Sequence, residues 1–256
     1  MDNCRQEYEE KFGQASVRIA LWNIAWRRPD SSAGKTILKL ILDKDPDIIC
    51  ITEGYEDFLP KSGYAITSDP DYGYMIKAGR RKVVLWSKNP WTHVDHIGDI
   101  TLPSGRFVRG ITETPVGPID MIGVCIPWKE AHVKTGRKDR GPWQDHLIYL
   151  QGLKNIMLEQ RSDHTILLGD FNQHIPRIKQ PKSAYDALMS AIPEDYTVAT
   201  AGEIKGAHSA AIDHLCHSRS LECKELSVLP QYDQIGARLS DHYGLFSNVG
   251  LSDPKI

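Results

Sequence analysis

HTILLGDFN, residues 164–172, is the most informative part of the sequence. The apolar run 166–168 predicts a strand buried on both faces, and Gly169 allows a sharp turn at its end. Asp170 and Asn172 follow, and residues two apart on an extended segment point to the same face. A carboxylate and an amide there suit a hard divalent cation and a phosphate. An ordinary strand with an Asx turn explains GDFN alone equally well, so the motif needs partners elsewhere.

The first quarter of the chain repeats this layout. VRIALWN (17–23) and DIICIT (47–52) predict two buried strands, and the segment between them predicts a helix. A helical crossover implies that the two strands are parallel. Asn23 stands at the end of the first strand and Glu53 at the end of the second. Three predicted strands are therefore each followed by, or end in, an oxygen-bearing side chain.

Short strand-like runs separated by turns fill the middle of the chain, and further helices are predicted at about 142–161 and 183–191. The other predicted strands are 73–76, 82–86, 91–97, 107–113, 119–126, 211–217, 221–229 and 243–249. We find no low-complexity linker. The expected organisation is a tail or short helix at 1–15, one domain at 16–250 and a tail at 251–256, with two mixed, mainly antiparallel sheets covered by helices.

Composition narrows the class of protein. The chain has 256 residues, 41% of them hydrophobic, which is enough for a sizeable core. A net charge of −2 excludes a global positive field, so any polyanion contact must be local. No apolar run approaches a membrane span and no signal pattern opens the chain. The five cysteines lack a C-x-x-C spacing, which favours reduced thiols and a cytoplasmic location.

Two short motifs near the C-terminal end add acidic and imidazole groups. AIDHL (211–215) places Asp213 in a strand, and SDH (240–242) places Asp241 and His242 just before the final strand. Taken singly, Asp213 could be a buried ion-pair member and His242 a hydrogen-bonded structural histidine. Their position at strand ends, like that of the earlier motifs, favours one common site.

Taken together, these motifs resemble the endonuclease/exonuclease/phosphatase family of metal-dependent phosphoesterases. The matching stretches occur in the family's order and cover nearly the whole chain: LWN (21–23), the glutamate of ITE (51–53), GDFN (169–172), IDH (212–214) and SDH (240–242). The resemblance implies a four-layer α/β/β/α sandwich of the α/β (α+β) class, with the site at one edge of the two sheets. It also implies hydrolysis of phosphodiesters or phosphomonoesters with Mg²⁺ or Mn²⁺.

The metal would be held mainly by Glu53, because a carboxylate, waters and a phosphate oxygen are usual ligands of Mg²⁺. Asn23 would assist the metal or position the catalytic acid. Asp241 would bind a second metal or steady the site. Metal coordination polarises a phosphoryl oxygen and stabilises the leaving oxyanion.

The proton transfers fall to the remaining motif residues. Asp170 is the candidate that orients or deprotonates the attacking water, and Asn172 would hydrogen-bond the phosphate. His242 and Asp213 would form a carboxylate–imidazole pair that favours imidazolium beside the phosphate. In the family the general base has been assigned to the aspartate and to the histidine, and the sequence leaves both open.

Two positions depart from the family pattern. The family often has an acid two residues after the asparagine, where this chain has Ala25. The strand 120–127 should present a histidine or tyrosine near its end, where Cys125 stands. Leaving-group assistance would then come from the metal alone, or from Trp128 or His132.

The loop WKEAHVKTGRKDRGPW (128–143) carries cations between two tryptophans next to the expected site. Cations and aromatic rings suit a phosphate backbone and a stacked base. Its candidate substrate-binding residues are Trp128, His132, Arg137 and Arg140. The alternative is a solvated surface loop, which most charged runs are.

The resulting hypothesis is a Mg²⁺-dependent phosphoesterase, first a nuclease or nucleotide phosphodiesterase acting on nucleic acid or nucleotides. A phosphatase of inositol phosphates or other small phosphate esters is the alternative within the same class. A non-catalytic binding module with the same fold would be expected to lack Glu53, Asp170 or His242, and all three are present. The sequence predicts no membrane contact and gives no oligomeric state.

Overall fold

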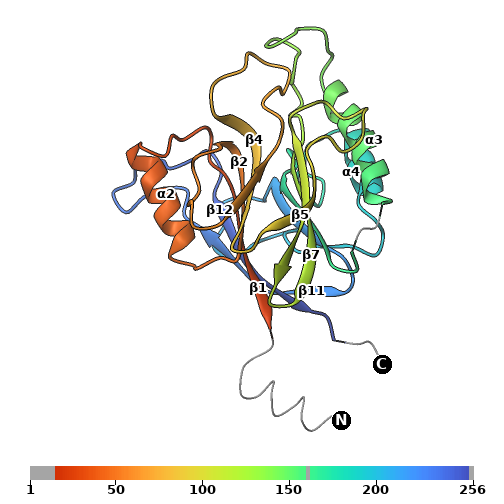
Figure 1. Ribbon diagram of the computed structural model, residues 1–256. Helices are drawn as coiled ribbons and strands as arrows, with labels where there is room; N and C mark the ends of the chain where they lie inside the picture. Colours follow the sequence, from red (N-terminus) through yellow and green to blue (C-terminus); the bar gives the residue numbers. More distant parts are fainter. Residues whose placement is uncertain (1–14, 160–161, 254–256) are drawn as a thin grey trace.

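Two six-stranded β-sheets lie face to face at the centre of the molecule (Figure 1). The computed structural model describes residues 15–159 and 162–253. The strands of the first sheet are, in order, β11 (Leu221–Leu229), β12 (Gly244–Leu251), β1 (Ser16–Asn23), β2 (Ile48–Tyr55), β4 (Arg80–Ser87) and β3 (Tyr64–Thr67). Those of the second are β5 (Trp91–Asp95), β6 (Phe107–Thr114), β7 (Gly117–Cys125), β8 (Thr165–Asp170), β10 (Asp213–His217) and β9 (Thr197–Val198).

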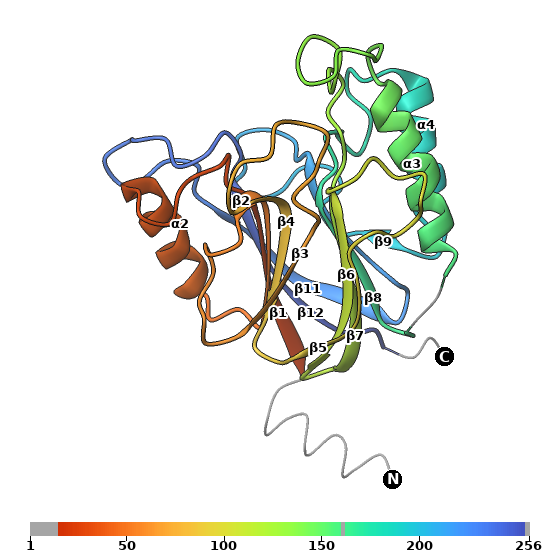
Figure 2. The same ribbon diagram turned by 45° about the horizontal axis from the view of Figure 1, so that its top comes forward.

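Helices cover the outer face of each sheet and complete the predicted four-layer sandwich (Figure 2). Helix α2 (Ser32–Leu42) packs Ile37 and Ile41 on the first sheet, while α3 (Gln144–Met157) and α4 (Lys182–Ala191) pack on the second. A third apolar cluster, which includes Leu21, Leu85 and Leu168, fills the space between the sheets. The central strands are therefore buried on both faces, which explains their nearly continuous apolar sequences.

Each sheet contains one parallel pair joined by a helix. β1 and β2 are parallel across α2, as predicted, and β7 and β8 are parallel across α3. Carboxyl ends of parallel strands meet at one edge of a sheet, where open α/β sheets place ligands. Asn23 ends β1, and Cys125 and Asp170 are paired neighbours at the ends of β7 and β8. The fold thus places the GDFN motif and the first-strand asparagine at the same edge.

Gly169 is the residue that allows β8 to end in this way. Its φ of 142° lies in a region that L side chains rarely adopt, and a Cβ atom there would lie 1.8 Å from the carbonyl oxygen of Val124. β7 and β8 therefore approach each other closely just before Asp170. The sharp turn expected after the apolar run depends on this contact.

A buried ion pair links β6 and β7 on the face that carries α3. The Arg109 Nε atom donates to both carboxylate oxygens of Asp120 at 3.0 Å, and Nη2 donates to Oδ2 at 2.5 Å. The side chains are 2% and 0% exposed. The guanidinium also donates to the carbonyl oxygen of Glu159 just beyond α3, so the pair ties the helix end to the sheet.

Some predicted elements were wrong. Residues 73–76 form no strand, and Met75 in this loop is 77% exposed, so an apolar run without a packing partner gave a false signal. The short strands β3 and β9 were missed because few residues carry their pattern. The tail or helix predicted at 1–15 lies almost wholly outside the described residues. β12 runs one residue into the predicted C-terminal tail, to Leu251.

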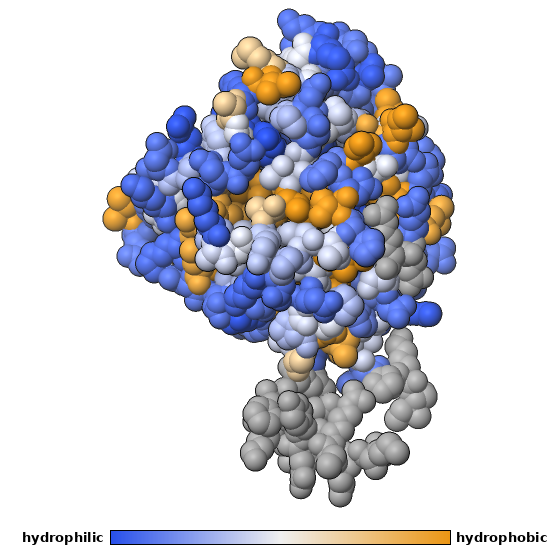
Figure 3. Space-filling view, viewed as in Figure 1, coloured by the Kyte–Doolittle hydropathy of each residue, from blue (hydrophilic) through white to orange (hydrophobic). Residues whose placement is uncertain are grey.

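The surface is largely hydrophilic on the face shown in Figure 3, with separate hydrophobic patches. Among the described residues, no helix combines the length and hydrophobicity that a membrane crossing requires.

Candidate active site

Asp170 lies at the centre of the candidate site, buried at the end of β8. The side-chain amide of Asn23 donates to Asp170 Oδ2 at 2.9 Å, and the backbone N–H of Asn172 donates to Oδ1 at 2.9 Å. The first of these bonds joins the ends of β1 and β8, which belong to different sheets. The amide of Asn23 thus holds the Asp170 carboxylate by a direct hydrogen bond.

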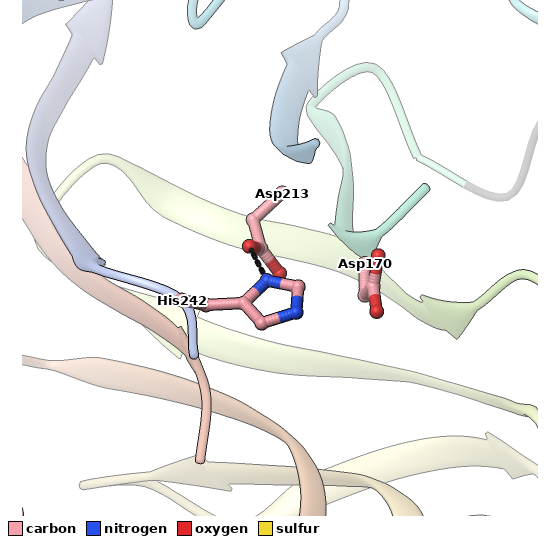
Figure 4. A group of neighbouring side chains, drawn as sticks. All are labelled: Asp170, Asp213 and His242. Atoms are coloured by element: carbon pink, nitrogen blue, oxygen red, sulfur yellow. Dashed lines mark hydrogen bonds and ion pairs between the residues drawn. The ribbon is translucent and has the colours of Figure 1, made fainter. Parts of the chain in front are cut away.

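His242 and Asp213 form the predicted carboxylate–imidazole pair. The His242 Nδ1 atom lies 2.5 Å from Asp213 Oδ2, and the ring lies between Asp213 and Asp170 (Figure 4). Ligand atoms of these three residues all lie within 4.8 Å of one another. The loop before β12 is fixed because Trp22 Nε1 donates to the His242 carbonyl oxygen, and the Ser240 hydroxyl donates to the Asn23 carbonyl oxygen.

This arrangement raises two pKa values, and the two shifts have different consequences for the charge of the site at neutral pH. Burial, together with the charge of Asp213, raises the pKa of Asp170 to about 7. Burial alone would lower the pKa of His242, but the charge and hydrogen bond of Asp213 outweigh it and raise this pKa to about 10. At neutral pH the site therefore holds an imidazolium beside a carboxyl group that can both accept and release a proton.

Glu53 enters the site from β2 with a left-handed backbone, φ 50°. Its Oε1 atom accepts a hydrogen bond from Lys82 Nζ at 2.5 Å. The carboxylate charge of Glu53 contributes to the raised pKa of Asp170. The predicted metal ligand and the predicted base are therefore close enough to interact electrostatically.

Asn172 and Asp241 border the central trio. Asn172 also has a left-handed φ, 53°, and its side-chain amide donates to the Ile126 carbonyl oxygen at 2.9 Å. The Asp241 carboxylate lies 4.0 Å from His242 Nε2, and its side chain is 56% exposed. Asp241, His242 and Asp213 also line a cavity of about 180 Å³. Solvent thus reaches the site from the side of Asp241.

The cationic loop 128–143 is organised around a buried carboxylate. Asp145 at the start of α3 accepts from Arg140 Nε at 2.6 Å and from Arg137 Nη2 at 3.4 Å. His132 is 2% exposed, stacks on Tyr74, and lies 3.8 Å from the same carboxylate. Three predicted substrate-binding residues are therefore engaged within the protein. Trp128, in contrast, is 45% exposed.

Lys82 and Ser240 belong to the site and were missed from the sequence. Lys82 begins an apolar run in β4, and its role becomes visible only when β2 and β4 are paired. Ser240 is part of the SDH motif, so its place was predictable, but its bond to Asn23 was not. Cys125 occupies the expected position at the end of β7, where burial raises the pKa of its thiol to about 12. A thiol that is neutral and fully buried is a poor proton donor.

The sequence profile of the Endonuclease/Exonuclease/phosphatase family matches residues 20–242, a span that includes every central residue of the site. The chain belongs to the Endonuclease/Exonuclease/phosphatase family. It is accordingly a hydrolase that acts on phosphate esters. The predicted family membership and fold are both confirmed. No curated protein sequence matches this chain.

Solved structures related to this Endonuclease/Exonuclease/phosphatase chain share its fold. A humanized D. rerio TDP2 is 11% identical, with a TM-score of 0.67 over 92% of this chain and 99% of that chain. The 3′ phosphatase NExo from Neisseria, bound to a product DNA hairpin, is 16% identical, with a TM-score of 0.64 over 90% and 98%. A family protein from Bacteroides vulgatus is 16% identical, with a TM-score of 0.63 over 93% and 100%.

The residues at the site fit the divalent cation that the Endonuclease/Exonuclease/phosphatase family implies. Asp213 Oδ1 is buried and has no hydrogen-bond partner among the described residues. The carboxylates of Glu53 and Asp213 each lie close enough to Asp170 to raise its pKa, and in the described part of the chain the ion pairs of these acids are with Lys82 and His242. A set of carboxylate and amide oxygens suits a hard cation such as Mg²⁺.

In this Endonuclease/Exonuclease/phosphatase chain, replacing His242 with glutamine is expected to make the free energy of unfolding less dependent on pH. The folded state holds a proton on His242 up to about pH 10, whereas the unfolded chain releases it near 6.5. The contribution of His242 is complete below pH 6.5 and decreases as the pH rises, by about 1.4 kcal/mol per pH unit. Urea denaturation in EDTA between about pH 6.5 and 9 measures this slope.

Both proteins also carry Asp170→Asn, because the His242 charge lowers the pKa of Asp170 and its loss would otherwise shift that titration into the measured range. The remaining titrating groups are then common to the two proteins. The free energy of unfolding of the glutamine variant should fall less steeply with pH than that of the protein that retains His242. Parallel pH profiles for the two proteins would contradict the raised pKa of His242.

Proposed function

We propose that this protein is a Mg²⁺- or Mn²⁺-dependent phosphodiesterase acting on nucleic acid or nucleotides, as a nuclease or nucleotide phosphodiesterase. One observation carries the proposal. Asp170, with a pKa near 7, lies within 4.8 Å of a histidine that remains protonated at neutral pH. A base and a fixed positive charge on the two sides of one small space suit attack of water on a phosphate ester.

Asp170 accepts the proton of the attacking water in this proposal, because a base whose pKa lies near the working pH is the most effective. The His242 imidazolium faces the phosphate and balances its developing negative charge. Asp213 keeps Nδ1 protonated and fixes the orientation of the ring. Asn172 has a second amide hydrogen, beyond the one bonded to Ile126, that can bind a phosphate oxygen.

Glu53 is the principal ligand that we assign to the cation, with Asn23 and Asp241 as further oxygen donors. When bound, the cation polarises the phosphoryl oxygen and stabilises the leaving oxyanion. The high pKa of Cys125 and the internal contacts of His132 leave neither suited to protonate the leaving group.

The loop 128–143 contributes to substrate binding in this proposal, with Trp128 as the exposed ring that stacks on a base. Arg137 and Arg140 are fixed on Asp145, and His132 stacks on Tyr74, so any contact of these three with a phosphate adds to an existing one. A guanidinium has five N–H donors and can bind two anions at once.

The exposed ring of Trp128 favours nucleic acid or nucleotides over inositol phosphates, because an aromatic ring can stack on a base and a sugar phosphate has none. Removal of a terminal phosphate from DNA is the second candidate, which the 3′ phosphatase among the similar structures supports.

Hydrolysis assays with Mg²⁺, Mn²⁺ or EDTA test the proposal. The substrates are single- and double-stranded DNA, RNA, bis-p-nitrophenyl phosphate and p-nitrophenyl phosphate. We expect metal-dependent cleavage of the polymers and the diester, with a lower KM for polymers if Trp128 stacks on a base. Cleavage of monoesters alone would replace this proposal with the phosphatase. Equal activity in EDTA would contradict the metal dependence.

We place this activity in the cytoplasm. Cys50, Cys125, Cys216 and Cys223 are free thiols, and the first three are buried in strands. Unpaired buried cysteines are typical of reducing compartments.

A further inference from the structure

Lys82 of β4 lies directly across from Glu53 of β2. The antiparallel ladder pairs Thr52 with Val83 and Gly54 with Arg81, so the two charged residues face each other at the intervening position. Lys82 Nζ lies 2.5 Å from Glu53 Oε1, and the side chains are 10% and 25% exposed. The ammonium is therefore a nearly buried cation bonded to the carboxylate that we assign to the metal.

Aromatic rings hold the ammonium in this position. Lys82 Nζ lies 5.2 Å from the ring centre of Trp26 and 5.4 Å from that of Tyr72. Such contacts stabilise a cation, but they do not replace an anionic partner in a buried setting. Lys82, Asp170 and Glu53 all act electrostatically on the buried thiol of Cys125, so the ammonium lies near the reacting groups as well.

We propose that Lys82 binds the substrate phosphate and that it competes with the divalent cation for Glu53. The inference rests on the proposed function, since it takes Glu53 as the metal ligand. In the metal-free protein the ammonium neutralises Glu53. In the working enzyme the carboxylate turns to the cation, and the ammonium takes a phosphate oxygen of the ester as its new partner.

Charge balance favours this exchange. An ammonium at hydrogen-bond distance from a ligand oxygen repels a divalent cation strongly, because both charges are shielded from water. Once Glu53 coordinates the cation, the ammonium of Lys82 would be nearly buried without the carboxylate that now balances its charge. A phosphate supplies the missing negative charge. Cation and phosphate therefore strengthen each other's binding through Lys82.

The test compares Lys82→Met and Lys82→Arg with the wild type. Methionine fills the space between the rings without a charge, and arginine retains the charge. Arg80→Met is the matched control, since this guanidinium also lies over Trp26, at 4.6 Å, but donates to the Tyr55 hydroxyl instead of Glu53. Thermal unfolding of each variant in EDTA confirms that it is folded.

Two affinities are measured, neither of which requires turnover. Mn²⁺ binding to the metal-free proteins is followed by the electron paramagnetic resonance signal of free Mn²⁺, and inorganic phosphate binding is then measured by calorimetry at saturating Mn²⁺. We expect Lys82→Met to bind Mn²⁺ about tenfold more tightly and phosphate about tenfold more weakly. Lys82→Arg and Arg80→Met should each remain within about threefold of the wild type for Mn²⁺.

Opposite changes in the two affinities support the proposal, because a general loss of structure would weaken both. Mn²⁺ binding that appears only in Lys82→Met also supports it. A folded Lys82→Met with unchanged or weaker Mn²⁺ binding overturns the competition, as does equal tightening in Lys82→Arg. Unchanged phosphate binding overturns the phosphate contact. Absence of Mn²⁺ binding in all four proteins contradicts the metal dependence of the proposed function as well.

Discussion

Asp170→Asn is expected to lower kcat/KM for bis-p-nitrophenyl phosphate by about 10²–10⁴-fold, the usual contribution of a general base. Asparagine has nearly the same shape and can still accept hydrogen bonds through its carbonyl oxygen. It cannot accept the proton of the attacking water. The loss should appear in kcat more than in KM, because the substrate makes the same contacts with both proteins. Steady-state kinetics with saturating Mg²⁺ gives both constants.

A carboxylate far from the site provides the control. Asp186 on α4 forms an exposed ion pair with Lys182, so Asp186→Asn should leave kcat/KM within about twofold of the wild type. An Asp170→Asn variant that keeps more than about a tenth of the wild-type kcat would show that another group removes the proton.

Asp120→Ala is expected to lower the free energy of unfolding by about 3–5 kcal/mol, one of the largest losses available to a single substitution here. The Arg109 guanidinium would remain buried under the end of α3 without its carboxylate. Desolvation of an unpaired charge causes the loss, more than the missing attraction does. Urea denaturation of the two proteins at one pH gives the difference.

A double variant separates these two contributions. Arg109→Met together with Asp120→Leu replaces the pair by apolar side chains of similar size, and such replacements are often neutral or stabilising. We expect the double variant to be more stable than Asp120→Ala alone. If it is instead destabilised further, the attraction within the pair and its bond to the Glu159 carbonyl oxygen contribute most of the stability.

The residues at strand ends could be predicted from the sequence because two signals agreed on them. Each followed a short apolar run, and the carboxyl ends of parallel strands share an edge. Asn23 and Asp170 satisfy both conditions, and a direct hydrogen bond joins them. Asp213 begins β10, which is antiparallel to β8, and His242 precedes β12, which is antiparallel to β1. Their pairing was expected from the family resemblance rather than from periodicity.

Partners across strands could not be predicted, because the sequence does not state the register of a sheet. Lys82 looked like the polar start of an apolar strand, and only its pairing with β2 places it against Glu53. The ion-pair partners of the cations in the loop 128–143 could not be predicted for the same reason. Its cations appear free in the sequence, yet a single carboxylate at the start of α3, Asp145, binds two of them.

The hydrogen bonds that fix the loop before β12 have a consequence for the timing of activity. Trp22 and His242 are 220 residues apart, and Ser240 and Asn23 are 217 apart. A chain still emerging from the ribosome can form β1 and β2 long before His242 has been synthesised. Once residue 170 has emerged, the chain carries Glu53 and Asp170 but still lacks His242. Under the proposed function, the site is therefore incomplete until the segment with Ser240 and His242 has been synthesised and has folded against β1.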